Sequence, residues 1–314
     1  MKCPAEFDPR LVEEAVHLAL RGRGEERAFH REREPAYGIS DPEDRDREFA
    51  RIGSHWFRRL GLGDPLRCVL VENRHALRTL ARCLVTQAPS SRQAGAELYV
   101  SDSGEQTLLI RIVPSVLVQE DHALEFLRRE LLHVTDMLDP AFEYEPRLGR
   151  SPSGPGEDRM LRDRYGVLWN CSVEGRLVRS GKSGADGRAR CLSDFRRSFA
   201  CLGDHAEICF ERIFSGERPR HSHLVALASD PRTAFGTGGE TPPSAGGRCP
   251  LCKFPASAFE PFPEKFPRRL LEEIGVDFPS WRPESGICRQ CADLYRALIP
   301  LPAADSERAD SANS

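Results

Sequence analysis

The chain has 314 residues, of which 30% are charged and 39% hydrophobic, and its net charge is −3. This balance is typical of a globular protein with one large and one small domain. It provides no overall attraction to a polyanion such as nucleic acid. The first residues lack the apolar core of a secretory signal, and no segment is apolar enough to span a bilayer. We therefore expect a soluble, cytoplasmic protein with no membrane partner.

Periodic patterns predict an α+β fold. In chain order, apolar residues at helical spacing predict helices over 11–20, 42–60 and 72–85. Strands are predicted over 67–71, 97–101 and 107–119, with the turn SDSGEQ joining the last two as a hairpin. Pro114 inside the third strand indicates a sheet edge or a bulge.

Three further helices are predicted after the hairpin. Asp121 is expected to cap the first, which ends at Leu138 because Asp139 precedes a proline. The other two cover 158–178 and 192–214.

Composition also divides the chain. Residues 148–159 read as a break, and the Gly-, Pro- and Ser-rich residues 228–247 read as a flexible linker. We predict a main domain over 1–227, a small module over 248–301 and a disordered tail over 302–314.

Four of the eleven cysteines form two C-x-x-C pairs, Cys249/Cys252 and Cys288/Cys291, with 35 residues between the pairs. Two such pairs supply the four thiolates that a structural zinc ion prefers. Gly286 can relieve the tight turn before the second pair, and 266–275 looks like a helical insert. The competing interpretation is a redox dithiol, but neither pair opens a helix in a thioredoxin-like pattern.

The predicted zinc module carries little net charge. It has eight Lys/Arg and seven Asp/Glu between residues 248 and 301. This balance disfavours phosphate binding and hence a nucleic-acid partner. The seven other cysteines are scattered, which fits small buried side chains in a reducing compartment.

The segment 121–140, DHALEFLRRELLHVTDMLDP, contains Glu130, His133, Asp136 and Asp139. It resembles the active-site helix of zincin metallopeptidases, whose motif is H-E-x-x-H. The resemblance implies that Glu130 is the general base and His133 a zinc ligand. Arg129 occupies the position of the first histidine, and a guanidinium cannot bind zinc.

The sequence does not decide which residue would supply the remaining zinc ligand. The metzincin branch implies Asp139, six residues after His133, although Asp136 stands where that branch has glycine. Helical spacing instead places Asp136 on the face of His133 and His122. The gluzincin branch takes a glutamate from a later helix, for which Glu174 is the candidate.

These patterns leave three functional hypotheses. The first is zinc-dependent hydrolysis of a peptide or protein substrate with an incomplete ligand set. The second is a non-catalytic pseudo-peptidase that binds a partner or scaffolds the zinc ribbon. The third is a nucleic-acid-associated factor, which the charge of the module disfavours. A purely structural role for the Glu130–His133 turn, with Arg129 paired to Glu125 or Asp136, competes with the first hypothesis.

Overall fold

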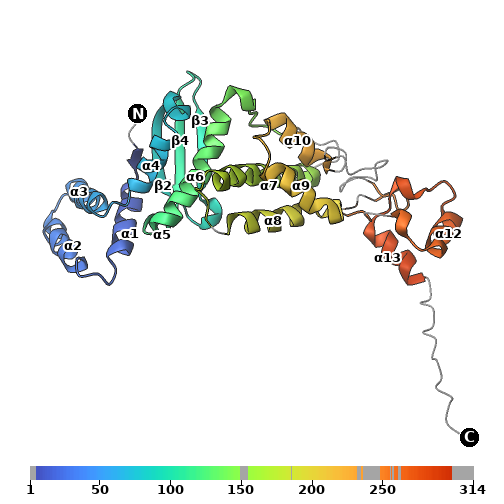
Figure 1. Cartoon of the computed structure of the whole chain (residues 1–314). Helices are drawn as coiled ribbons and strands as arrows, with labels where there is room; N and C mark the ends of the chain where they lie inside the picture. The colour runs from blue at the N-terminus through green and yellow to red at the C-terminus, as the bar shows by residue number, and fades with distance from the viewer. Residues whose placement is uncertain are drawn as a thin grey trace, which may run out of the picture. The chain divides into compact units, whose positions relative to one another are not determined.

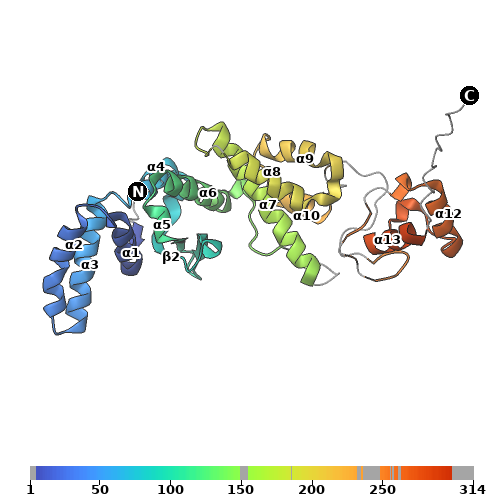
Figure 2. The ribbon, with the colours of Figure 1, turned by 90° about the horizontal axis from the view of Figure 1, so that it is seen from below.

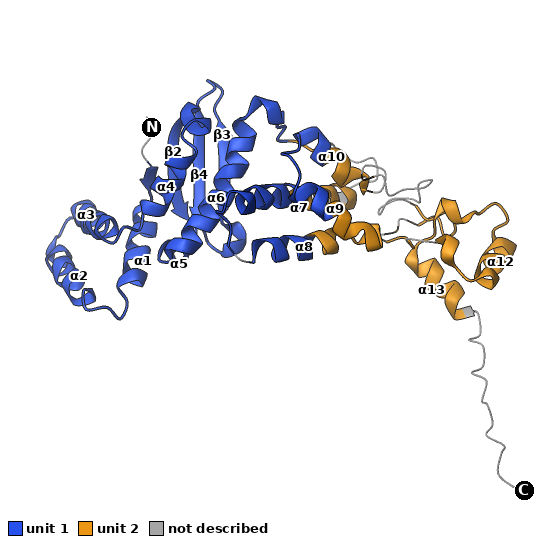
Figure 3. Cartoon of the chain, viewed as in Figure 1, with its two compact units in different colours: residues 1–146, 167–194, 210–224 blue, residues 147–166, 195–209, 225–314 orange. Residues whose placement is uncertain are grey.

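The computed structural model describes residues 5–148, 155–184, 186–231, 235, 248–254, 256, 258–260 and 263–298. Figure 1 gives the order of its elements. The chain divides into two compact units, which Figure 3 distinguishes by colour. Unit 1 comprises residues 1–146, 167–194 and 210–224, and unit 2 comprises the rest. The α+β class is confirmed, and the described residues are mainly helical.

Unit 1 contains a four-stranded mixed sheet in the order β1-β2-β4-β3. The strands β1 (Ala5–Phe7), β2 (Leu80–Gln87) and β4 (Gln106–Ile112) run parallel, and β3 (Gly95–Val100) pairs antiparallel with β4. The predicted hairpin is therefore confirmed. The side chains of Leu108, Ile110 and Ile112 alternate along β4 and are fully buried, as expected for a strand with one face in the core.

Helices α1 (Pro9–Leu20), α2 (Glu26–Arg33) and α3 (Pro42–Arg59) follow β1. Asp8 and Asp41 cap α1 and α3 by accepting hydrogen bonds from the first-turn backbone. α2 and α3 lie side by side in both views (Figures 1 and 2). Their apolar faces contribute Phe29 and Trp56 to the core of unit 1.

The structure corrects two of the predicted elements. The predicted strand 67–71 is wrong because these residues belong to α4 (Asp64–Glu72), where Leu66, Val69 and Leu70 form a buried helical face. The predicted helix 72–85 is also wrong. That segment contains a 3-10 turn, Ala76–Thr79, followed by β2. A short apolar run fits either a helix or a strand, so its periodicity alone does not decide between them.

β4 ends earlier than predicted. Pro114 does not sit at a strand edge or bulge but opens the short helix α5 (Pro114–Leu117), a position that tolerates its missing N–H. The next helix, α6 (Glu120–Leu138), begins after Gln119, and Asp121 is not its cap. Its predicted end is confirmed, because Asp139 is the C-cap residue and Pro140 opens a 3-10 turn, Pro140–Phe142. α6 packs against α4 and β3.

The next helices along the chain are α7 (Pro155–Arg179), α8 (Gly187–Ser198), α9 (Ala206–Phe214) and α10 (His221–Ser229). α7 confirms the predicted helix, although it includes the end of the predicted break. The single helix predicted over 192–214 is wrong. A 3-10 segment, Ala200–His205, separates α8 from α9, and Gly203 within it has a φ of 52°. Gly175 of α7 lies against the Phe214 carbonyl, and a Cβ there would stand 1.8 Å from that oxygen.

The C-terminal residues form a small structure with its own core. Its elements are two 3-10 turns, Pro263–Lys265 and Pro283–Ser285, and the helices α12 (Arg268–Asp277) and α13 (Arg289–Leu298). The predicted helical insert thus corresponds to α12. The predicted linker has its first residues in α10, whereas residues 232–234 and 236–247 and the predicted tail 302–314 lie outside the described residues.

Candidate metal centre

The first C-x-x-C pair lies in a tight backbone turn. The Lys253 N–H donates to the Cys249 carbonyl, and the Cys249 N–H donates to the Phe254 carbonyl, both at 2.9 Å. Lys253 has a φ of 62°, which is uncommon for a side chain other than glycine. This closed turn directs both cysteine side chains of the pair to one side.

The second pair lies where an extended segment enters α13. Cys288 forms an antiparallel bridge with Phe259, and Cys291 lies in the first turn of the helix. Gly286 has a φ of 77°, which confirms that glycine relieves the turn before this pair. Two residues between the cysteines place both sulfurs on the same side of the helix start.

The two pairs meet at one point. All four Sγ atoms lie within 4.8 Å of one another, and the Cys249–Cys291 and Cys252–Cys288 sulfurs are 4.0 and 3.9 Å apart. A tetrahedral zinc ion with Zn–S bonds of about 2.3 Å requires sulfurs about 3.8 Å apart. A disulfide would require about 2.05 Å. The donor set and its spacing therefore fit a metal ion such as zinc.

The surrounding backbone favours thiolate at one of these sulfurs. Burial raises the pKa of Cys249, but N–H groups of Cys288, Cys252 and Leu251 lower it, with a net result of about 7. The Cys288 N–H lies 3.4 Å from the Cys249 sulfur. Burial raises the pKa of Cys291, and the neighbouring sulfurs raise it further. A cation at the centre would remove this repulsion, because zinc binds the deprotonated form.

A compact apolar core supports the cluster. Leu270 and Ile274 of α12 pack with Trp281, Ile287 and two of the cysteines. The Trp281 indole N–H donates to the Gly286 carbonyl at 2.8 Å, which holds the glycine turn in place. A core of this size supports little stability alone, so a metal cross-link would add substantially to it.

His133 of α6 lies against the later helix α7. Its Nε2 is 2.9 Å from the Asn170 Oδ1, and its ring packs edge-on against Trp169 with centroids 4.5 Å apart. Its Nδ1 is buried and has no hydrogen-bond partner in the described part of the chain. Burial lowers the pKa of His133 to about 4, against the opposing influence of Asp136 and Asn170. The imidazole is therefore neutral near pH 7.

Asp136 is fully buried, and N–H donors surround both oxygens of its carboxylate. Arg176 of α7 donates to both of its carboxylate oxygens, at 2.9 and 2.5 Å, and the Trp169 indole N–H donates at 2.8 Å. Arg218 approaches one oxygen at 3.5 Å. A carboxylate enclosed by two guanidinium groups and an indole has its lone pairs occupied by protein donors.

Asp139 and Glu130 each have protein partners of their own. Asp139 forms a 2.5 Å ion pair with Arg218, and the Ala141 N–H and Arg218 lower its pKa. Glu130 accepts a hydrogen bond from the Ala96 N–H of β3 at 3.1 Å and lies 3.5 Å from Arg129. Burial raises the pKa of Glu130, although Arg129 and the Ala96 N–H partly offset this effect.

Three further residues named in the zincin comparison are Glu174, His122 and Arg129. Glu174 is buried in α7 and accepts a hydrogen bond from the Ser183 hydroxyl. His122 is exposed on the first turn of α6. Arg129 pairs with Glu130 rather than with Glu125, whose ion-pair partner is Arg190. Among the described residues, the only group of three or more metal-capable side chains brought to one point is the cysteine cluster.

Sequence reasoning did not identify Trp169, Asn170, Arg176 and Arg218, the residues that engage His133 and Asp136. They lie 33 to 82 residues away along the chain, and no local spacing connects them with α6. Finding them requires knowing that α7 and the segment around Arg218 lie beside α6.

Within the part of the chain that the structure describes, no helix has the combination of length and apolar character needed to cross a bilayer. No family model, curated protein or solved structure matches the chain. The arrangement of its side chains is therefore the basis for a functional proposal.

Proposed function

We propose that the chain is a metal-binding protein whose four-cysteine cluster holds one structural zinc ion. The supporting observation is the convergence of four sulfurs at distances that suit a tetrahedral ion. Four protein ligands leave no coordination position for water or substrate. Zinc at this centre would therefore stabilise residues 248–298 and would not perform catalysis.

Cobalt substitution tests this assignment. Metal-free full-length protein titrated with Co²⁺ should bind one equivalent with the intense charge-transfer absorption of tetrahedral thiolate coordination. The Cys252→Ser variant should lose this spectrum, whereas Cys68→Ser, at an exposed cysteine of α4, should retain it. Octahedral Co²⁺ absorption in the wild type, or no loss in Cys252→Ser, would contradict the proposal.

We further propose that unit 1 is a non-catalytic relative of the zincin peptidases. Three observations support this proposal. α6 lies beside the edge strand β3, and the Glu130 carboxylate contacts that strand. The later helix α7 meets His133 through Asn170 rather than through the predicted Glu174. Arg129 stands where the resemblance implies the first zinc ligand, and Asn170 occupies the Nε2 of His133, the second implied ligand; neither side chain is a typical zinc ligand.

Restoring the implied ligands tests the relationship. Arg129→His alone should not add a metal ion, because Asn170 still holds His133. The double variant Arg129→His/Asn170→Glu should bind a second zinc ion beyond that of the cysteine cluster. A double variant that folds, by circular dichroism, and binds no second zinc would contradict the zincin relationship.

Activity provides the complementary test. Wild type and Glu130→Gln should show the same background hydrolysis of casein and of a peptide library. The two proteins differ only in whether residue 130 can act as a general base. Zinc-dependent hydrolysis by the wild type that disappears in Glu130→Gln would show a working peptidase and overturn the non-catalytic proposal.

A further inference from the structure

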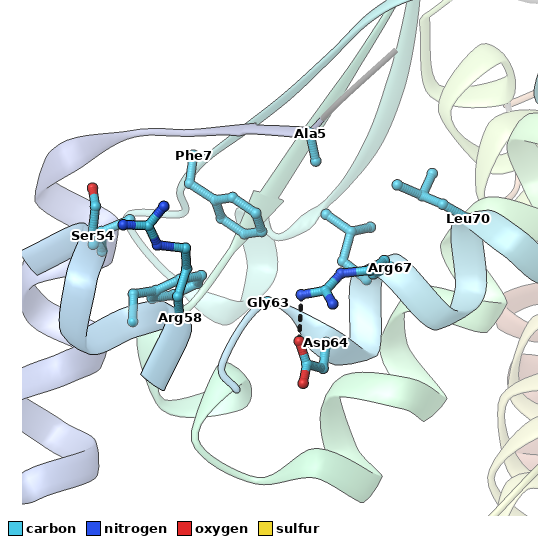
Figure 4. Close-up of a pocket in the computed structure, with 11 residues that line it drawn as sticks. Ala5, Phe7, Ser54, Arg58, Gly63, Asp64, Arg67 and Leu70 are labelled. Atoms are coloured by element: carbon cyan, nitrogen blue, oxygen red, sulfur yellow. Dashed lines mark hydrogen bonds and ion pairs between the residues drawn. The ribbon is translucent and has the colours of Figure 1, made fainter. Parts of the chain in front are cut away.

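A pocket of about 470 Å³ lies in unit 1, away from α6, between β1, α3 and the start of α4 (Figure 4). Its volume lies within the usual range for small-molecule sites. The apolar part of its lining includes Phe7 of β1, Phe57 of α3, and Leu66 and Leu70 of α4. The pocket is thus bounded by rigid secondary structure on several sides.

The apolar floor is fixed by close packing. The Phe7 and Phe57 rings contact each other with centroids 4.9 Å apart and a 55° tilt. The backbone of Gly63 lies directly on these rings, since a Cβ there would be 3.1 Å from Phe57 and 3.6 Å from Phe7. Contact with this surface favours an aliphatic or aryl group.

Two arginines line the pocket, and only one of them forms an ion pair. Arg67 is neutralised by Asp64 at 2.5 Å, the ion pair drawn as a dashed line in Figure 4. Arg58 lies with Ser54 on the other side of the Phe7 ring, and no hydrogen bond or ion pair engages its guanidinium among the described residues. The pocket therefore presents one unpaired positive charge beside an apolar surface.

We propose that this pocket binds a small carboxylate with an apolar tail, such as a medium-chain fatty acid. The tail would cover Phe7 and Phe57, and the carboxylate would accept hydrogen bonds from Arg58, with the Ser54 hydroxyl nearby. An alkylammonium would repel Arg58, and a neutral alcohol would leave its charge unpaired. The site is independent of the cysteine cluster and of the α6 residues.

Calorimetric titration of the full-length protein tests the proposal with octanoate as the probe. Octanoate should bind saturably with one site per chain, and octylammonium should not bind. Arg58→Ala should weaken octanoate binding about tenfold, the loss expected for a hydrogen bond between charged groups. Arg47→Ala, on the same helix but outside the pocket and paired with Asp44, should bind as the wild type does.

A second variant tests whether octanoate binds in the pocket rather than elsewhere on the protein surface. Ser54→Trp places a large ring over the pocket from an exposed helix position, so it should fold normally and abolish octanoate binding. Sedimentation with phosphatidylglycerol vesicles distinguishes a free carboxylate from a lipid surface. The proposal is overturned if the wild type does not bind octanoate, or if Arg58→Ala and Ser54→Trp bind it with wild-type affinity. It is also overturned if the protein binds the vesicles but not free octanoate.

Discussion

The cysteine cluster and the α6–α7 contact both gather metal-capable side chains, but they differ in what occupies those side chains. In the cluster, the four sulfurs lie close together, and the neighbouring sulfurs raise the pKa of Cys291, so deprotonating all four would require a cation. Between α6 and α7, Asp136 is enclosed by Arg176, Arg218 and Trp169. The His133 Nε2 contacts Asn170, whereas its Nδ1 has no hydrogen-bond partner among the described residues. The two regions thus differ in whether protein donors already occupy the anionic groups that could bind a metal.

The largest expected effect is loss of the small module. Cys288→Ser removes a ligand and should unfold residues 248–298, because structural zinc contributes about 10–16 kcal/mol of apparent binding free energy. Limited proteolysis should then cleave within the module, and the Trp281 emission should shift to the red. Cys68→Ser is the control. If Cys288→Ser resists protease as the wild type does, the module does not need a bound metal ion to fold.

Breaking the buried charge network of unit 1 should have the next largest effect. Asp136→Ala leaves Arg176 and Arg218 without their buried partner and should lower the free energy of unfolding by about 3–5 kcal/mol. Asp44→Ala, which removes an exposed ion pair with Arg47, should change it by less than about 1 kcal/mol. Urea denaturation of both variants measures the difference. If both variants lose less than about 1 kcal/mol of unfolding free energy, the ion pairs of Asp136 do not stabilise the fold.

The neutral state of His133 predicts a pH dependence of stability. Its pKa is about 4 in the folded protein and about 6.5 when unfolded. The unfolded chain therefore binds the proton first as the pH falls, and stability present above pH 6.5 is lost progressively toward pH 4. At pH 5 the loss should be about 2 kcal/mol.

Comparison of wild type with His133→Gln isolates this contribution. The stability difference between about pH 7.5 and pH 5 should be smaller in His133→Gln than in the wild type, by about 2 kcal/mol. A direct NMR titration of the His133 ring gives the same answer. An imidazole that titrates near its usual pKa would contradict the buried, neutral assignment.

The smallest effect is expected at Glu130. Glu130→Gln retains a side-chain oxygen that can accept from the Ala96 N–H and removes a charge that burial disfavours. Its free energy of unfolding should change by less than about 1 kcal/mol. Glu130→Ala should cost more, because it leaves the Ala96 N–H of β3 without this acceptor. Equal losses would show that the hydrogen bond to β3 adds nothing.

The accuracy of the sequence predictions followed how local the signal was. The cysteine cluster was predictable because each C-x-x-C pair is a local turn, and only the pairing of the two turns is long-range. The end of α6 was predictable for the same reason, from Asp139 and Pro140. The segment 67–85 was not, because Leu70, Val71 and Leu84 fit a helix or a strand equally well until a sheet forms around β2.

The partners of His133 and Asp136 could not be predicted, since they come from α7 and from Arg218. Spacing within α6 correctly grouped His133 with Asp136 but gave no information about what covers that face. The sequence also gave no signal for the pocket beside Arg58, whose lining comes from β1, α1, α3 and α4.

The zinc content of the full-length protein shows which of the two groups of side chains holds metal. Elemental analysis after purification without added metal or chelator should give one zinc ion per wild-type chain and none in Cys288→Ser. One zinc should also remain in a His133→Gln variant, because no group of metal-capable side chains converges on His133 among the described residues. Two zinc ions in the wild type with one lost in His133→Gln would show a metal site between α6 and α7, and no zinc in the wild type would rule out zinc at the cysteine cluster.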